Sequence, residues 1–502
     1  MLKSKWKIII MPDVIILRWT SLKYVNYNRV PVKHTDPDER VRSLDIRTLV
    51  PYTIEEVTAE ASRCIGCGLC VEGCPARIDI PGYQIAVANG DLAEALKINF
   101  EKLPFVGVCG NVCPHPCEDH CVLDDNNGPI ATRHVKKFVA ENVEDYGETL
   151  KIVRNDLGGH PRVAVIGGGP SGLTAAFYLS INGIQVDVFE ATDRPGGMMV
   201  HGIPSFRLSR DLVRKEADHI FSYGARIFYN TKVGRDIKFE DLMNEYEAIY
   251  IAVGNWSPSR TRTKGEELKG VYHALEFLGR VNAGERIEVG DTVAIIGGGF
   301  TAFDAARLSL RLGAKHVVVM YRRAATDRPG YPSSNADEEL EEAEEERIEF
   351  MWEVTPFEYV GENNHVKAIK YWKNRMVDTG RGRREPEPMK DREFVINVDT
   401  IIEATGQRGD LSFLPEDIRN KIDMTPSGDI IVNQYNMTTY PGIFAGGDIT
   451  NRRKDIISGV ADAGRAVMGI LFFLKERGKI EKIPAKLINF ENGPYPRTSA
   501  FR

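Results

Sequence analysis

The hydrophobic pattern predicts two copies of one strand–turn–helix unit. The apolar run Arg162–Ile166 predicts a short buried strand, and a glycine-rich turn and an alanine-rich helix follow it. Ile184–Phe189 predicts the next strand, and the same order of elements returns at Val293–Ile296 and His316–Met320. Strands that alternate with helices favour parallel sheets, so we expect an α/β fold.

A different pattern precedes these units. Ile54–Ser62 and Ile130–Val143 have helical periodicity, whereas residues 1–50 are polar and carry no periodic signal. The segment Asn155–Pro161 contains two glycines and a proline and predicts a linker. We therefore expect an N-terminal extension at residues 1–50 and a mainly α-helical domain at residues 51–150, ahead of the α/β part.

Composition and charge exclude several classes of protein. With 42% hydrophobic and 27% charged residues, the chain is not disordered, collagen-like or a coiled coil. Its 65 basic and 71 acidic side chains leave a net charge of −6, too small to indicate a nucleic-acid or anionic-membrane partner. The acidic segment Asp337–Glu349 predicts a solvated helix face.

The chain gives no strong membrane or secretion signal. Apolar runs such as Ala466–Leu474 fall short of the roughly 20 residues of a membrane-spanning helix. Met1–Met11 is a poor signal peptide, because its apolar stretch ends at Pro12 and no small-residue cleavage site follows. We expect a cytoplasmic protein with no membrane span.

The cysteines are clustered in one part of the chain. All eight lie between Cys64 and Cys121, which favours a metal site over disulfide bonds. The first four follow the spacing of bacterial 4Fe–4S ferredoxins, Cys64-x2-Cys67-x2-Cys70-x3-Cys74-Pro75. This spacing directs three thiolates to one cubane and the fourth away from it. We expect an iron–sulfur cluster here in preference to structural zinc or a group of buried thiols.

The second set of cysteines is less specific. Cys109, Cys113, Cys117 and Cys121 recur every four residues, and prolines at positions 114 and 116 argue against a regular helix. Taken alone, this set fits a cluster and a structural role about equally well. Together the two sets supply enough thiolates for two 4Fe–4S clusters.

The first glycine-rich turn matches the dinucleotide-binding fingerprint. Gly167 allows the tight turn, Gly169 lets a pyrophosphate approach the backbone, and Gly172 lets the helix pack on the strand. Glu190 ends the following strand, where an acid binds ribose hydroxyls. Glycine-rich turns also occur without a ligand, but this full order of elements favours a nucleotide, either FAD or NAD.

The second glycine-rich turn ends differently. Ala302 replaces the third glycine, which the fingerprint permits, and Arg322 and Arg323 stand where the first unit has Glu190. A guanidinium binds a 2′-phosphate that an acid would repel, so this site suits NADPH. Arginines are also common on surfaces without a ligand, and the preference for NADP over NAD rests on this charge argument.

Further motifs give the chain a resemblance to a known family. Ala-Thr-Gly at 404–406 and Gly-Asp at 447–448 are similar to late FAD-domain motifs of two-dinucleotide flavoproteins. Residues Pro195–Leu208 contain Gly-Gly-x4-Gly-Ile-Pro-x-Phe-Arg-Leu, and the N-terminal part carries Cys74-Pro75, Asn111-x-Cys113-Pro114 and Gly128-Pro129-Ile130. Over about residues 45–475 the chain resembles the glutamate synthase small (beta) subunit-like FAD/NADPH iron–sulfur flavoproteins. That family includes the large subunit of NADH-dependent ferredoxin:NADP oxidoreductase, also described as archaeal sulfide dehydrogenase, and the electron-entry half of dihydropyrimidine dehydrogenase.

The resemblance implies an architecture and a set of nucleotide ligands. Two Rossmann-like domains are expected after the iron–sulfur domain: an FAD domain at 162–290 and 402–475, an NAD(P)H domain at 291–401, and then a tail at 476–502. The implied FAD ligands are Gly167, Gly169, Pro170, Ser171, Gly172, Glu190, Gly197, Arg207, Thr405, Gly406, Gly447, Asp448, Gly459 and Val460. The implied NADPH ligands are Gly297, Gly299, Phe300, Thr301, Ala302, Arg322 and Arg323.

The resemblance also implies cluster ligands. One cluster would bind Cys64, Cys67, Cys70 and Cys121, and the other Cys74, Cys113, Cys117 and a Glu or Gln from the helix after Gly128-Pro129-Ile130. The aligned position is Lys136, and an ammonium cannot bind iron. Cys109, His134 or Glu141 could supply the fourth ligand, or the cluster could be a three-iron or incomplete one.

The implied function is electron transfer between NADP(H) and ferredoxin or a partner catalytic subunit. FAD and the nicotinamide carry the hydride transfer, so no side chain is expected to be catalytic. The expected partner is a second redox subunit, ferredoxin or both, within a hetero-oligomer. A stand-alone NAD(P)H-dependent sulfur or polysulfide reductase and a redox-inactive assembly subunit are the alternatives. A thiol-relay disulfide reductase is excluded, because every cysteine precedes residue 122.

Overall fold

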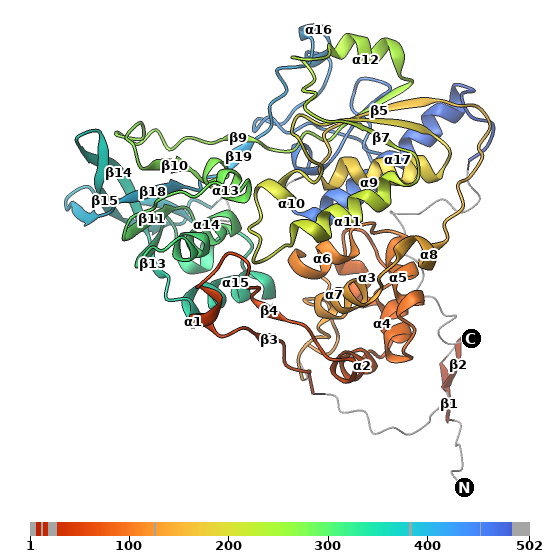
Figure 1. Cartoon of the computed structure of the whole chain (residues 1–502), viewed down its shortest axis with the longest axis horizontal. Helices are drawn as coiled ribbons and strands as arrows, with labels where there is room; N and C mark the ends of the chain where they lie inside the picture. Colours follow the sequence, from red (N-terminus) through yellow and green to blue (C-terminus); the bar gives the residue numbers. More distant parts are fainter. Residues whose placement is uncertain are drawn as a thin grey trace.

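The computed structural model describes residues 7–11, 14–18, 28–124, 127–380, 384–451 and 453–483. A helical domain lies below one five-stranded sheet, and a second five-stranded sheet lies to the side (Figure 1). Of the expected extension, β1 (Lys7–Met11) and β2 (Val14–Arg18) form a hairpin. The other residues of the extension before residue 28 lie outside the described residues, including residues 1–6 of the segment Met1–Met11, and so does the tail beyond residue 483.

The N-terminal domain is helical, as predicted. Helix α2 has the expected bounds, and its N-terminus is fixed by a capping box between Thr53 and Glu56. Helix α6 ends at Val112, before the two prolines, so the second cysteine set does not lie on one helix. The helices are α1 (Pro37–Arg40), α2 (Ile54–Ser62), α3 (Leu69–Gly73), α4 (Ile80–Ala88), α5 (Leu92–Phe100), α6 (Val106–Val112), α7 (Thr132–Asn142) and α8 (Tyr146–Leu150), with β3 (Lys33–His34) pairing β4 (Leu49–Val50).

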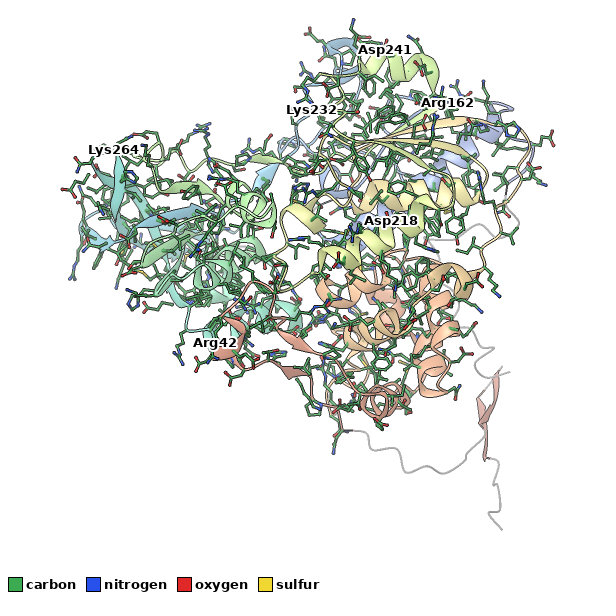
Figure 2. All side chains as sticks on the ribbon, viewed as in Figure 1. Arg42, Arg162, Asp218, Lys232, Asp241 and Lys264 are labelled. Carbon is green, nitrogen blue, oxygen red and sulfur yellow. The ribbon has the colours of Figure 1, made fainter. Side chains whose placement is uncertain are left out.

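The first sheet is entirely parallel and confirms the predicted α/β fold. Its order is β20 (Ile443–Ala445), β8 (Ala248–Ile251), β5 (Arg162–Ile166), β6 (Gln185–Phe189) and β7 (Arg226–Phe228). Both faces are covered: α9 (Pro170–Ile181), α11 (Arg210–Phe221) and α17 (Ile456–Glu476) lie on one, and α12 (Phe239–Glu245) and α16 (Glu416–Arg419) on the other. At the start of β5, Arg162, which is labelled in Figure 2, donates to Asp187 of β6 over 3.0 Å.

The second sheet is also parallel and corrects the expected domain boundaries. Its order is β10 (Val271–His273), β18 (Thr400–Glu403), β11 (Thr292–Ile296), β12 (His316–Tyr321) and β13 (Glu349–Trp352). Because β10 pairs with β18, this unit begins at Val271 rather than at residue 291 and ends after residue 401. Strands β9 (Ser257–Pro258) and β19 (Gln407–Arg408) pair where the chain crosses between the two sheets.

Helices cover one face of the second sheet and an antiparallel sheet covers the other. The helices are α13 (Ala274–Asn282), α14 (Phe300–Arg311) and α15 (Ser334–Glu345). The covering sheet contains β14 (Val354–Glu362), β15 (His365–Val377), β16 (Glu385–Pro388) and β17 (Phe394–Asn397). Lys264 pairs with Glu358 at the outer end of this sheet (Figure 2).

The acidic segment after residue 337 is not simply a solvated helix face, which corrects the expectation. Glu339 and Glu342 of α15 and Glu346 just after it are buried, because arginines from three other segments bind them. The ion pairs are Arg207–Glu339, Arg307–Glu342, and Arg40, Arg307 and Arg311 with Glu346.

The helical domain contacts both of its neighbours. Glu216 of α11 accepts hydrogen bonds from the amides of Gly107 (2.6 Å) and Val108 (3.1 Å) at the start of α6. At the other side, the amide of Ser334 at the start of α15 donates to Asp119 over 3.1 Å. The cysteine-bearing segment is therefore held between the two nucleotide-fingerprint units.

Helix α17 is the one described helix that is long and apolar enough to cross a membrane by length and composition. However, 78% of its apolar window is buried inside the protein. It packs along α9 beneath the first sheet, where a core helix of this length is expected to be apolar.

Candidate nucleotide and iron–sulfur sites

The first fingerprint turn has no room for side chains at Gly167 and Gly172, whereas a Cβ on Gly169 would meet only the Cα of Gly197, at 4.0 Å. A Cβ on Gly167, whose φ is +105°, would lie 2.5 Å from the carbonyl oxygen of Ala252, and a Cβ on Gly172 would lie 2.0 Å from that of Gly167. The start of α9 therefore approaches β5 and β8 closely. Its free amides and positive dipole end are suited to a pyrophosphate.

The structure brings most of the expected FAD residues together around this helix end. Gly197 meets Gly169, since a Cβ on Gly197 would lie 3.0 Å from the Cα of Gly169. The hydroxyl of Ser171 donates to the carbonyl of Gly459 over 2.8 Å, and Gly447 also abuts Ser171. These residues come from three distant parts of the sequence.

Two expected FAD residues carry carboxylates. Glu190 is buried and accepts a hydrogen bond of 2.7 Å from the amide of Gly168, so it lies against the fingerprint turn. Asp448 lies in the short 3-10 helix η2 (Gly447–Ile449), where burial, together with Asp455 and Asp462, raises its pKa to about 6. A neutral Asp448 can donate a hydrogen bond as well as accept one.

Several buried polar atoms at this edge have no partner among the described residues, and sequence reasoning missed them. Both amide atoms of Asn255, which follows β8, are unpaired, as are the hydroxyl of Ser458 and Nε2 of His201. Asn255 approaches Gly409, which itself packs on Ile449 of η2. Unpaired buried polar groups are costly, so a ligand rich in hydrogen-bonding atoms, such as FAD, fits this edge. No motif marked Asn255 in the sequence.

Three residues expected to bind FAD have hydrogen-bond partners in other segments. Arg207 is directed into the second unit, where it donates to Asp304 over 2.7 Å and pairs with Glu339. Thr405 and Gly406 follow β18 and bond to Ser259 at the crossing between the sheets, over 2.6 and 2.8 Å. Arg207 is thus an interdomain ion-pair residue in this structure.

The second fingerprint repeats the geometry of the first. Gly297 has a φ of +149°, and a Cβ there would lie 2.3 Å from the carbonyl oxygen of Ala404. Phe300 and Thr301 begin α14, and Ala302 is buried in the core. The loop after β12 covers this helix end, since Pro329 approaches Gly299 at 3.7 Å from its ideal Cβ.

The arginines of the second site flank this loop. Arg322 is exposed, and the half-buried Arg323 has an Nε without a partner among the described residues. Arg328, which is 5% exposed, also has an unpaired Nε, although it bonds to Ala325 and Asp337. These guanidinium groups are suited to a phosphate near the second turn.

The first expected set of cysteine ligands lines a single hollow. Cys64, Cys67, Cys70 and Cys121 face it, together with apolar side chains of which Ile65 and Ile80 are examples. Burial raises the pKa of Cys64 to about 11 and that of Cys70 further. Iron binding replaces the thiol protons, and the donor set therefore fits a 4Fe–4S cluster.

Four other cysteines form a more deeply buried group, which we call the buried cysteine group. Its members, Cys74, Cys109, Cys113 and Cys117, lie close enough to interact electrostatically with Lys136. A hydrogen bond from Cys109 lowers the pKa of Cys113 to about 6. Burial lowers the pKa of Lys136, but the four cysteines outweigh it and the net pKa is raised.

The other two candidates for the fourth ligand lie elsewhere. Glu141 pairs with Lys137 and Arg47. His134 packs beside Tyr52, and burial lowers its pKa well below the usual value. Of the three candidates, Cys109 is the one that the structure puts beside Cys113.

Comparisons with known proteins agree with this class of site. Residues 161–467 match the pyridine nucleotide-disulphide oxidoreductase family, and residues 45–148 match the 4Fe–4S cluster domain II of dihydropyrimidine dehydrogenase. The glutamate synthase (NADPH) small chain of Escherichia coli is 30% identical over 89% of this chain and 99% of its own length. The chain belongs to the pyridine nucleotide-disulphide oxidoreductase family and to its glutamate synthase small chain-like members.

Two further relatives extend the comparison. The NADP(+)-dependent formate dehydrogenase subunit beta of Moorella thermoacetica is 34% identical over 81% of this chain, which spans 60% of that protein. Mycobacterium tuberculosis FprA in complex with NADPH has the same fold, with a TM-score of 0.53 and 20% identity over 64% of this chain and 87% of FprA. The protein is therefore an NAD(P)H-dependent iron–sulfur flavoprotein oxidoreductase with an FAD site and a 4Fe–4S region.

Proposed function

We propose that the chain is an electron-transfer subunit that links NADP(H) to ferredoxin or to a partner catalytic subunit. Bound FAD would supply the conversion between two-electron hydride transfer from NADPH and one-electron transfer to iron–sulfur clusters. The chain's own residues bind and orient the two nucleotides and the clusters.

The order of the sites is the observation that carries this proposal. Asp455, which caps α17 at the edge of the FAD cradle, is close enough to Cys113 of the buried cysteine group to raise the pKa of its thiol. Cys74 of this group is in turn close enough to Cys70, a ligand expected at the first cluster, to raise the pKa of that thiol. The buried group has little exposure, whereas Cys67, another ligand expected at the first cluster, is exposed. This order supports a path from a flavin through a buried cluster to a cluster near the surface.

The face around Cys67 supports a protein partner. Ile65, Leu69 and Val122 are large apolar side chains, and each is more than 40% exposed there. Exposed apolar patches on soluble proteins commonly mark protein interfaces. The relatives from Moorella and E. coli are named as a beta subunit and a small chain, which also supports a heteromeric assembly.

An anaerobic titration tests the proposal. The purified chain is titrated with NADPH and, separately, with NADH, while flavin and cluster absorbance are followed and iron is counted. NADPH should bleach both chromophores at a far lower concentration than NADH does. Bleaching by neither nucleotide would favour the redox-inactive assembly subunit. Rapid polysulfide reduction by the chain alone would favour the stand-alone reductase.

A further inference from the structure

Lys136 is a buried cation without a carboxylate partner. Lys136 lies on α7 and is 4% exposed. No Asp or Glu among the described residues forms an ion pair with its ammonium. The charges that raise the pKa of its ammonium most strongly are those of Cys113, Cys109, Cys117 and Cys74. A buried ammonium is costly unless an anion compensates it, so these four sulfur atoms are its candidate counter-ions.

Backbone packing brings the four cysteines to this ammonium. Helices α6 and α7 touch where a Cβ on Gly110 would lie 2.6 Å from the Cα of Lys137, one residue after Cys109 and Lys136. Cys109 and Cys113 are one helical turn apart, joined by a backbone hydrogen bond of 3.3 Å.

The turn before Cys74 completes this arrangement. A Cβ on Gly73 would lie 2.9 Å from the carbonyl oxygen of Pro116 in the loop that carries Cys117. Three chain segments and one ammonium therefore converge at one place.

We infer that the second cluster is held by four cysteines, with Cys109 in the place of the missing α7 ligand, and that Lys136 is its counter-ion. A cubane with four thiolate ligands is an anion, and this supplies the charge that Lys136 lacks. This inference rests on the proposed function, because it concerns the second cluster of the proposed electron path.

The position of Lys136 has a redox consequence. Reduction adds one negative charge to the cluster, and a nearby ammonium stabilises the more negative state. Lys136 therefore raises the reduction potential of the second cluster, which makes it the better electron acceptor beside the FAD cradle.

Iron content and EPR of the full chain test the ligand assignment. The anaerobically reconstituted protein should bind about eight iron atoms. Cys109→Ala should lose the second cluster or convert it to a three-iron form, and keep the first. Cys67→Ala should lose or alter the first cluster and keep the second. The assignment is overturned if Cys109→Ala keeps the wild-type iron content and both EPR signals. It is also overturned if Cys67→Ala loses all the iron that the wild-type chain binds.

Redox titration followed by EPR tests the role of Lys136. Lys136→Met should lower the potential of the second cluster, and Lys136→Arg should restore it. The matched control is Lys137→Met, the next residue, because its ammonium already pairs with Glu141. An unchanged potential in Lys136→Met overturns the counter-ion role. If NADPH then fails to reduce the flavin of a chain holding both clusters, the proposed function fails while this inference stands.

Discussion

The carboxylate of Glu346 offers a direct test of how the N-terminal arm is attached. It accepts hydrogen bonds of 2.7 Å from Arg40 and from Arg307, and one of 2.8 Å from Arg311. All four side chains are 0% exposed. Glu346→Gln removes the negative charge and leaves three buried guanidinium groups around a neutral amide.

The stabilisation that Glu346→Gln should remove can be obtained from the pKa of the Glu346 carboxyl group. Burial alone would raise it, but the arginine hydrogen bonds and charges lower it from 4.5 to about 2. That shift corresponds to about 3 kcal/mol of stabilisation of the ionised form. Burial lowers the pKa of Arg311, whereas at Arg307 burial is outweighed by Glu342 and Glu346. Both arginines remain charged near pH 7. The pKa shift of the Glu346 carboxylate therefore gives the size of the stabilisation.

The sign of the pH dependence follows as well. Because the folded-state pKa is below the unfolded value of 4.5, the stabilisation is present above pH 4.5. It is lost as the pH falls through about 2. At pH 7, Glu346→Gln should therefore destabilise the attachment of α1 to α14 and α15 by about 3 kcal/mol.

Hydrogen exchange measures this attachment locally, which suits a chain of several domains. Amides of α1 and α15 should exchange about a hundredfold faster in Glu346→Gln than in the wild type. The control is Glu345→Gln: Glu345 also pairs with Arg40, at 2.9 Å, but its side chain is 49% exposed. That change should cost less than about 1 kcal/mol. Equal effects of the two substitutions would refute the reasoning.

Three further outcomes are expected. Asn255→Ala removes two unpaired buried atoms, so the apo chain should be at least as stable as wild type in thermal unfolding, while FAD binding weakens in a flavin-fluorescence titration. Arg322→Ala should lower the NADPH-to-NADH ratio of kcat/KM by roughly tenfold to a hundredfold in steady-state assays, through loss of a charge-assisted bond. Gly172→Ala should abolish FAD retention on gel filtration, because its Cβ would lie 2.0 Å from the oxygen of Gly167.

Local chemistry made several elements predictable from the sequence. The strand Arg162–Ile166 and the helix Ile54–Ser62 have the expected bounds. In each case nearby residues fix the end, since the glycines begin the turn after the strand and the capping box begins the helix. The two glycine-rich turns, each followed by a helix, were predictable for the same reason.

Contacts between distant segments were not predictable in this way. The short strands β10 and β18 join the second sheet only because they pair with each other and β18 pairs with β11. The acidic helix α15 buries one face because arginines distant in the sequence reach it. Arg207 belongs to the same network, although its motif indicated a nucleotide ligand. Composition and periodicity do not indicate which distant residues will pair in the fold.

Lys136 shows why a ligand rule has to be applied in three dimensions. Along the sequence, an ammonium at the position of an iron ligand indicates a damaged cluster site, because Lys has no lone pair to offer when charged. In the fold, Lys136 is surrounded by four thiols and no carboxylate pairs with it among the described residues. The cation thus argues for an anion at this place. A substitution that removes one ligand is compatible with a cluster when another thiol lies within reach, and Cys109, one helical turn before Cys113, meets that condition.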